Sequence, residues 1–168
     1  MNKSFSFFFL IITLSLTSSC LKDKNEERTE ETERIEISNL LLDMKNAGNV
    51  IDTTSSGMYY VVYKAGNGFL PQVGDTCYVE YFGSFIDGVI FESSQSIYPE
   101  GIREIIYKET ELLDGFEEAI SLMKKGTEAT FIIPSKLALG STWHDFIPPF
   151  TTVIYSIKMH DLKPKIIE

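Results

Sequence analysis

The sequence predicts an α+β fold in which one short helix packs across a curved sheet of antiparallel strands. Two observations favour this fold class. Short runs rich in β-branched and aromatic residues recur between Gly57 and Met159, and turn-forming residues separate them. A single amphipathic stretch, Leu112 to Met123, interrupts these runs, so the strands do not alternate with helices as they would around a parallel sheet.

The length and the composition allow one folded domain with appendages. Of the 168 residues, 43% are apolar, which is enough for one core of ordinary size but not for two independent domains. We expect three segments. They are a lipoprotein signal peptide at 1–19, a charged tether with a short amphipathic helix at 20–55, and the folded domain at 56–164.

The first twenty residues are typical of an export signal. Lys3 supplies a positive charge, and the apolar run from Phe5 to Leu16 is too short for a permanent membrane span. Small residues then lead into Cys20, a pattern that resembles the bacterial lipobox, whose cysteine carries acyl chains such as palmitate. We expect a cell-envelope protein that lipidated Cys20 anchors to a membrane. The alternative is an ordinary cleavable signal with an incidental cysteine.

A charged segment separates the signal from the folded domain. Residues 21–36 contain almost no apolar side chains, so we expect them to be solvated and mobile. Apolar residues then recur at a helical period from Ile35 to Ala47, and Gly48 can end the helix. This helix either lies on the domain as a linker or offers a face for self-association.

The strands of the domain are predicted from alternating and β-branched runs. Cys77, Val79 and Tyr81 occupy every second position of one run, so they should share its inner face. Asp87-Gly88 predicts a turn into the following strand. The expected strands are 57–63, 76–81, 89–91, 127–133 and 152–159.

The helix of the domain has its own start and stop signals. Asp114 should be the N-cap, with Glu117 reaching back toward it, and Gly126 should stop the helix. An apolar stripe would face the sheet. It consists of Leu112, Leu113, Phe116, Ala119, Ile120 and Met123.

The charge and the few potential ligands exclude several classes of function. The formal net charge is -9, which disfavours nucleic acid as a partner and binding to anionic membranes through a basic surface. Cys20 and Cys77 lie far apart, and His144 and His160 form no cluster with them. We therefore expect no metal, no cofactor and no disulfide within the chain.

Five groups of short motifs are spread through residues 57–163. They are Val79-Glu80-Tyr81-Phe82-Gly83; Asp87-Gly88-Val89-Ile90-Phe91-Glu92-Ser93-Ser94; Glu111-Leu112-Leu113-Asp114-Gly115-Phe116-Glu117-Glu118-Ala119; Met123-Lys124-Lys125-Gly126; and Ile133-Pro134 with Leu137-Ala138-Leu139-Gly140 and Ile147-Pro148-Pro149. In this order and at nearly this spacing, the motifs resemble those of the FKBP family of peptidyl-prolyl cis-trans isomerases. Each motif alone is weak, whereas the ordered set is specific.

The resemblance implies a half barrel of antiparallel strands wrapped around one short helix, and it implies prolyl isomerase activity. Rotation about an X-Pro bond is opposed by about 18–20 kcal/mol because amide resonance is lost when the bond twists. A dry aromatic pocket holds the less polar twisted amide better than water does. Such a pocket therefore lowers the barrier without a covalent step.

The resemblance also assigns the aromatic residues of the pocket. Phe116 corresponds to the floor, where the family usually has Trp, and Tyr81, Phe91 and Tyr155 correspond to the walls. Taken singly, each of these residues is better explained by core packing. Their joint placement favours a pocket.

Four further residues complete the assigned pocket. Leu112 and Leu113 lie at the start of the helix, and the backbone N–H of Leu113 would donate to a carbonyl of the bound peptide. Phe146 and Ile147 belong to a loop that would close one side.

The sequence departs from the family pattern at several positions. Leu139 stands where the family usually has a Tyr whose hydroxyl binds the ligand, and Glu92 replaces a shorter Asp. His144, near the tip of the loop, is either a surface residue or a substrate contact. The pocket residue expected between 95 and 106 is unassigned, with Ile102 and Ile105 as candidates.

Two classes of function remain from the sequence. The first is a peptidyl-prolyl isomerase that assists the folding of exported proteins and binds their proline-containing segments. The second is a low-activity binding or chaperone module of a cell-envelope or motility complex, in which Leu139 and Glu92 mark a weakened site. The whole chain is similar to FKBP-type lipoproteins associated with gliding motility in Bacteroidetes.

Overall fold

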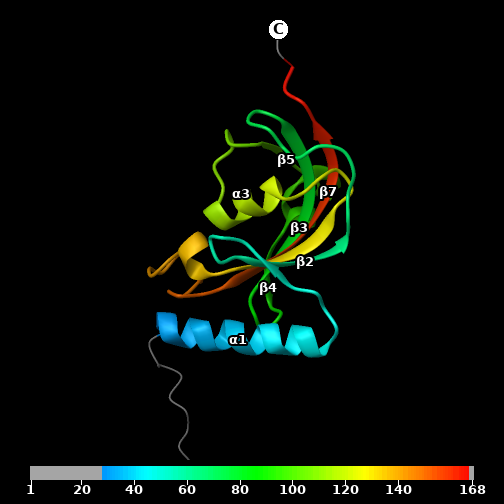
Figure 1. The fold of residues 1–168 in the computed structure, drawn as a ribbon. Coiled ribbons are helices and arrows are strands. Elements are labelled where there is room, and N and C mark those ends of the chain that lie inside the picture. The colour runs from blue at the N-terminus through cyan, green and yellow to red at the C-terminus, as the bar shows by residue number, and fades with distance from the viewer. Residues whose placement is uncertain (1–27, 167–168) are drawn as a thin grey trace, which may run out of the picture.

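The structure, a computed structural model, describes residues 28–166 and contains a seven-stranded antiparallel sheet (Figure 1). The predicted signal peptide, lipidated Cys20 and the first part of the tether lie outside the described residues. The strands run in the spatial order β1-β2-β6-β7-β3-β4, and β5 pairs with β3. Their bounds are β1 Asp52–Thr53, β2 Tyr59–Lys64, β3 Thr76–Ser84, β4 Ile90–Ser93, β5 Arg103–Ile106, β6 Glu128–Ile133 and β7 Val153–Lys163.

Strand β3 organises the sheet because it has neighbours on both sides along its length. It pairs with β7 on one side, and on the other side it pairs first with β5 and then with β4. Its side chains alternate between buried and partly exposed, so that Cys77, Val79 and Tyr81 lie in the core, as predicted.

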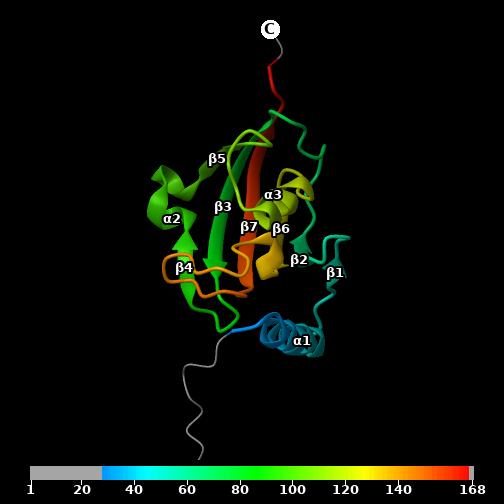
Figure 2. The same cartoon turned by 90° about the vertical axis from the view of Figure 1, so that its left-hand side faces the viewer.

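The helices lie on different parts of the sheet. They are α1 Glu30–Asn46, α2 Ser94–Ile97 and α3 Asp114–Ser121, with 3-10 turns η1 Pro99–Gly101 and η2 Ser135–Leu137. Figures 1 and 2 show α3 packed against the curved sheet and α1 lying across the end where β7 begins. The α+β fold with a helix inside a partly closed sheet is confirmed.

The ends of α3 differ from the prediction. The N-cap is Leu113 rather than Asp114, which is already helical, and Glu117 forms an ion pair with Lys108 instead of reaching back to the cap. Both acidic residues are still favourable in the first turn, where the helix dipole is positive. The helix ends at Ser121, well before Gly126. Four members of its apolar stripe are buried as expected, namely Phe116, Ala119, Ile120 and the following Met123, whereas Leu112 and Leu113 are partly buried.

Helix α1 begins earlier than predicted, and residues 28–36 are not a solvated, mobile tether. Thr29 and Thr32 form a capping box, which starts the helix at Glu30. The side chains of Glu33 and Ile37 are buried, at 5% and 8% exposed. The prediction failed because a charged sequence stays solvated only when its charges lack partners in the folded domain.

Several segments were not predicted. Strands β1 and β5 were missed, and so was the connection through α2 and η1 that precedes β5. In that connection Ser94 is fully buried, and its hydroxyl donates to the carbonyl of Gly101 and accepts from the backbone N–H of Tyr81. The polar run around Ser94 thus resembled a loop in the sequence although it is tied to β3.

No helix between residues 28 and 166 has both the length and the apolar character needed to cross a membrane. The same part of the chain has no group of three metal-ligating side chains placed to hold an ion.

Candidate functional site

Four aromatic side chains from four different elements meet inside the sheet. Phe116 of α3 contacts Tyr155 of β7 edge to face at 4.8 Å between ring centroids, and Tyr81 of β3 at 5.3 Å. Phe91 of β4 meets Tyr155 at 5.9 Å, again nearly perpendicular. Perpendicular rings place the positive edge of one ring on the negative face of the next, which stabilises this arrangement beyond burial alone.

The close approach of these rings depends on Gly83 in β3. Gly83 lies opposite Tyr155 on one side and Glu92 on the other. A Cβ atom at this position would lie 2.9 Å from the rings of both Phe91 and Tyr155. The missing side chain therefore leaves the space in which the two aromatic walls stand.

The aromatic cluster borders a hollow in two adjoining parts. One part, of about 430 Å³, lies under the loop between β6 and β7, and the other, of about 330 Å³, lies at the start of α3. Glu92, Leu113 and Tyr155 line both parts, so the two parts adjoin at these residues. A hollow of this size suits a proline ring with its flanking residues.

Nine of the ten predicted pocket residues line this hollow. They are Phe91, Glu92, Leu112, Leu113, Phe116, Leu139, Phe146, Ile147 and Tyr155. The tenth, Tyr81, is only 1% exposed and packs behind Phe116 and Tyr155, so it supports the wall rather than facing the hollow. Their role in binding remains a prediction.

The two tyrosines of the cluster stay neutral over a wide pH range. Burial raises the pKa of Tyr81 well above its ordinary value, and the neighbouring Glu92 carboxylate raises it further. Burial also raises the pKa of Tyr155, again with a contribution from Glu92, whereas Arg103 acts in the opposite direction. The phenols of Tyr81 and Tyr155 are thus uncharged near neutral pH.

The start of α3 offers a free backbone donor to the hollow. The carbonyl of Leu113 accepts from the N–H of Glu117, but the N–H of Leu113 itself donates to no acceptor within residues 28–166. Leu113 lines both parts of the hollow. Its N–H is therefore placed to bind a carbonyl of a ligand, as the sequence resemblance implied.

The loop over the hollow is defined by its own hydrogen bonds. The backbones of His144 and Ile147 bond to each other in both directions, at 3.1 and 2.8 Å. Phe146, which lines the hollow, is 63% exposed, and Trp143 in the same loop is 67% exposed. His144 also lines the hollow, which keeps open its role as a substrate contact.

Three charged or polar lining residues were missed by the sequence analysis. Arg103 and Glu111 line the part near α3, and Asp145 lines the part under the loop. The candidates proposed instead do not line the hollow: Ile105 is fully buried opposite Cys77, and Ile102 precedes β5. Arg103 had no sequence signal, because a charged residue in a short irregular segment is normally a surface residue.

Comparison with known proteins agrees with this geometry. Residues 69–160 match the family described as FKBP-type peptidyl-prolyl cis-trans isomerase. The chain belongs to the FKBP family. It is 33% identical over 114 residues to the FKBP-type isomerase FkpA of Escherichia coli K12, covering 68% of this chain and 41% of that protein. It is 36% identical over 110 residues to a probable FkpA of Neisseria meningitidis, covering 65% and 39%.

Solved structures show the same FKBP fold. The crystal structure of FkpA from Escherichia coli superposes with a TM-score of 0.66 at 27% identity, covering 82% of this chain and 63% of that one. A peptidyl-prolyl isomerase from Pseudomonas syringae also gives 0.66, at 21% identity, covering 82% and 98%. The chain spans only about 40% of the length of the FkpA proteins, so their whole-protein activities are not transferred with the fold.

Proposed function

We propose that the chain is a peptidyl-prolyl cis-trans isomerase that acts on proline-containing segments of exported polypeptides. The observation that carries this proposal is the hollow bordered by perpendicular aromatic rings, with the unpaired N–H of Leu113 at its edge. The planar amide of an X-Pro bond is more polar than the twisted one. A dry aromatic hollow therefore favours the twisted form relative to water and lowers the rotational barrier.

Four groups at the hollow have a part in this mechanism. Phe116 would support the proline ring, and Phe91 and Tyr155 would enclose it. The N–H of Leu113 would hold a carbonyl of the flanking backbone, which fixes the peptide while the X-Pro bond turns. No side chain needs to exchange a proton, because no covalent bond is made or broken.

The test is the cis-to-trans relaxation of a Leu-Pro tetrapeptide with a Cys20→Ser chain. We expect acceleration above the spontaneous rate. Phe116→Leu should lower kcat/KM by about tenfold, which corresponds to a barrier that is higher by about 1.4 kcal/mol. Leucine keeps an apolar side chain at this position but removes the ring. Leu122→Ala, at the partly exposed C-cap of the same helix, is the control and should leave the rate unchanged.

A second candidate is a low-activity binding module of an envelope or motility complex. Leu139 favours it, since this lining residue offers no hydroxyl to a ligand. Leu139→Tyr separates the two candidates. If the wild type does not accelerate relaxation but Leu139→Tyr does, the binding module replaces the isomerase; under the isomerase proposal the wild type is active and the variant gains about three- to tenfold, the value of one hydrogen bond.

The proposed location is the cell envelope, with the chain held to a membrane by lipidated Cys20. The apolar segment and the small residues before Cys20 support this location, as does the similarity to gliding-motility lipoproteins that the sequence suggested. Cys20→Ala should move the protein from the membrane fraction to the soluble fraction. A variant that stays with the membrane would contradict the lipid anchor.

A further inference from the structure

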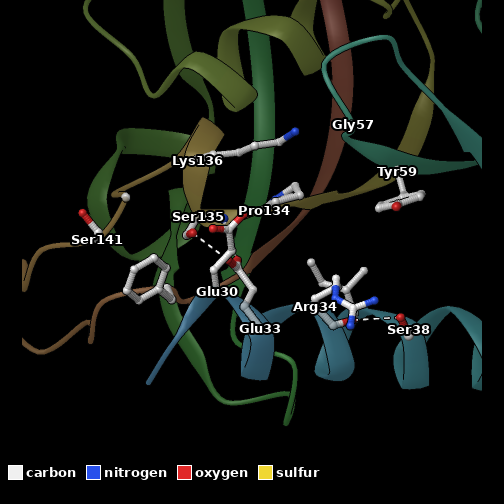
Figure 3. A pocket seen from close by; sticks show the side chains of 13 residues that line it. Glu30, Glu33, Arg34, Ser38, Gly57, Tyr59, Pro134, Ser135, Lys136 and Ser141 are labelled. Carbon is white, nitrogen blue, oxygen red and sulfur yellow. Dashed lines mark hydrogen bonds between the residues drawn. The ribbon is translucent and has the colours of Figure 1, made fainter. Parts of the chain in front are cut away.

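A buried carboxylate joins helix α1 to the FKBP domain. Glu33 is 5% exposed and accepts three hydrogen bonds. Its Oε1 accepts from the backbone N–H of Ser135 and from the hydroxyl of Thr152, both at 2.7 Å, and its Oε2 accepts from the Ser135 hydroxyl at 2.6 Å. Figure 3 shows Glu33 reaching from α1 to Ser135. These short, charge-assisted bonds are the strong class of hydrogen bond.

The three donors belong to the two ends of one loop. Ser135 lies two residues after the end of β6, and Thr152 directly precedes β7. Between them, residues 136–151 carry five residues that line the candidate site. They are Leu139, His144, Asp145, Phe146 and Ile147.

The bonds of Glu33 continue into the loop through its backbone. The carbonyl of Ser135 accepts from the N–H of Gly140 at 2.8 Å, and the carbonyl of Gly140 accepts from the N–H of Phe150 at 2.9 Å. Arg28, just before α1, donates to the carbonyl of Phe150 at 3.0 Å and pairs with Glu36 at 2.6 Å. Both ends of loop 136–151 are therefore held by hydrogen bonds to the helical segment.

The backbone of Phe150 shows that this closure constrains the loop. Its φ is 51°, in the left-handed region that an aromatic residue rarely adopts. Such a conformation persists where its surroundings fix it, and here both its N–H and its carbonyl are bonded.

The position of Glu33 is not explained by charge pairing. None of the ion pairs within residues 28–166 includes Glu33. A carboxylate without a cation is buried only where hydrogen-bond donors replace its water, so Glu33 is held by its bonds to the ends of the loop. A hollow of about 500 Å³ lies beside these bonds and is lined by α1 on one side and by Lys136, Ser141 and Phe150 on the other (Figure 3).

We propose that Glu33 is a positioning residue: from α1 it fixes both ends of loop 136–151 and so places Leu139, Phe146 and Ile147 against the proline-binding hollow. This inference rests on the proposed isomerase function. Helix α1 would then contribute to substrate binding by the FKBP domain and would not be only a spacer. Substitutions of Glu33 should therefore change substrate binding although Glu33 does not line the hollow.

The first experiment compares Glu33→Gln and Glu33→Ala with the parent Cys20→Ser chain below its melting temperature. The amide hydrogens of Gly140 and Phe150 donate to the carbonyls of Ser135 and Gly140. They should exchange at least tenfold faster in Glu33→Ala. Amides of Tyr155 and Ile157 in β7 should keep their rates. Glu33→Gln keeps one acceptor oxygen for Ser135 N–H and Thr152, so its effect should be intermediate.

The second experiment measures kcat and KM separately on the Leu-Pro tetrapeptide. Glu33→Ala should raise KM about fivefold with a smaller change in kcat, because a loosened loop closes less often over the bound peptide. Thr152→Val, which removes one donor at nearly constant volume, should give a smaller shift in the same direction. Asp43→Asn, on the exposed part of α1, is the matched control and should change neither constant.

Two outcomes separate this inference from the proposed function. If Glu33→Ala lowers the Tm but leaves loop exchange and KM as in Asp43→Asn, α1 only stabilises the domain and the inference is overturned. If the parent chain shows no isomerase activity, the proposed function fails. The exchange rates of Gly140 and Phe150 still decide, by the same comparison, whether Glu33 fixes the loop.

Discussion

The phenol groups of Tyr81 and Tyr155 determine how the site responds to pH. Burial and Glu92 raise the pKa of both hydroxyls, so the protonated form is favoured in the folded chain. The hydroxyls of Tyr81 and Tyr155 therefore lose their protons at a higher pH than a free tyrosine, whose ordinary pKa is about 10.

The expected result is a flat pH profile for the tyrosines. Between pH 9 and 10.5, kcat/KM for the Leu-Pro tetrapeptide should change by less than about twofold, because the buried phenols stay neutral where a tyrosine with the ordinary pKa of about 10 would ionise, and no proton is transferred. The measurement is the relaxation rate across this range. A fall of about threefold or more by pH 10.5 would show that a phenol of the site titrates near its ordinary value.

Single residues of the site were predictable to different degrees. The aromatic residues were found because each belongs to a motif of specific composition and spacing. Arg103 could not be found, since its place in the hollow depends on the pairing of β5 with β3, which a four-residue strand in an irregular segment does not reveal. Glu33 is similar: its partners lie 102 and 119 residues further along the chain.

At the scale of elements, the site is built where β3, β4 and β7 come together around α3. Gly83 is the point at which this assembly is tightest, because the rings of Phe91 and Tyr155 occupy the space that its side chain would need. The packing of the strands and the shape of the hollow are therefore linked through one residue.

Gly83→Ala tests this link. The added methyl group should push both rings away and lower kcat/KM by about tenfold, while overpacking lowers the free energy of unfolding by about 1–3 kcal/mol. Relaxation kinetics and urea unfolding provide the two measurements. Ser84→Ala, the next position in β3, is the control. Full activity in Gly83→Ala would mean that the rings move without changing the site.

Elements with regular patterns were predicted well, and those fixed by distant contacts were not. Strands β2, β3, β6 and β7 and helix α3 were found near their observed positions from periodicity and turn residues. The start of α1 was placed too late because its first turns are charged, and the reason they are ordered is a buried carboxylate bonded across the fold. Short β1 and β5 have too few residues to show a pattern.

At the scale of the whole molecule, the folded unit extends further toward the N-terminus than the sheet does. Arg28 and Glu33 connect the helical segment to the loop between β6 and β7. The predicted boundary at residue 56 would cut this connection. The domain bounds remain a prediction, but these contacts favour a unit that includes α1.

Truncation tests the extent of the folded unit. A fragment that starts at Ser55 should melt about 5–10 °C below one that starts at Arg28, because it lacks three hydrogen bonds to a carboxylate as well as the burial of Ile37. Scanning calorimetry measures both. Equal melting temperatures would show that α1 contributes nothing to the stability of the domain.

The exposed position of Trp143 on the loop gives the chain an optical reporter. It is the sole tryptophan in the sequence, and it stands beside His144, which lines the hollow. Its fluorescence should already be red-shifted in the native state, since its ring is mostly in water. The fluorescence of Trp143 should therefore change when a proline peptide binds beside the loop. It should change little when the core unfolds.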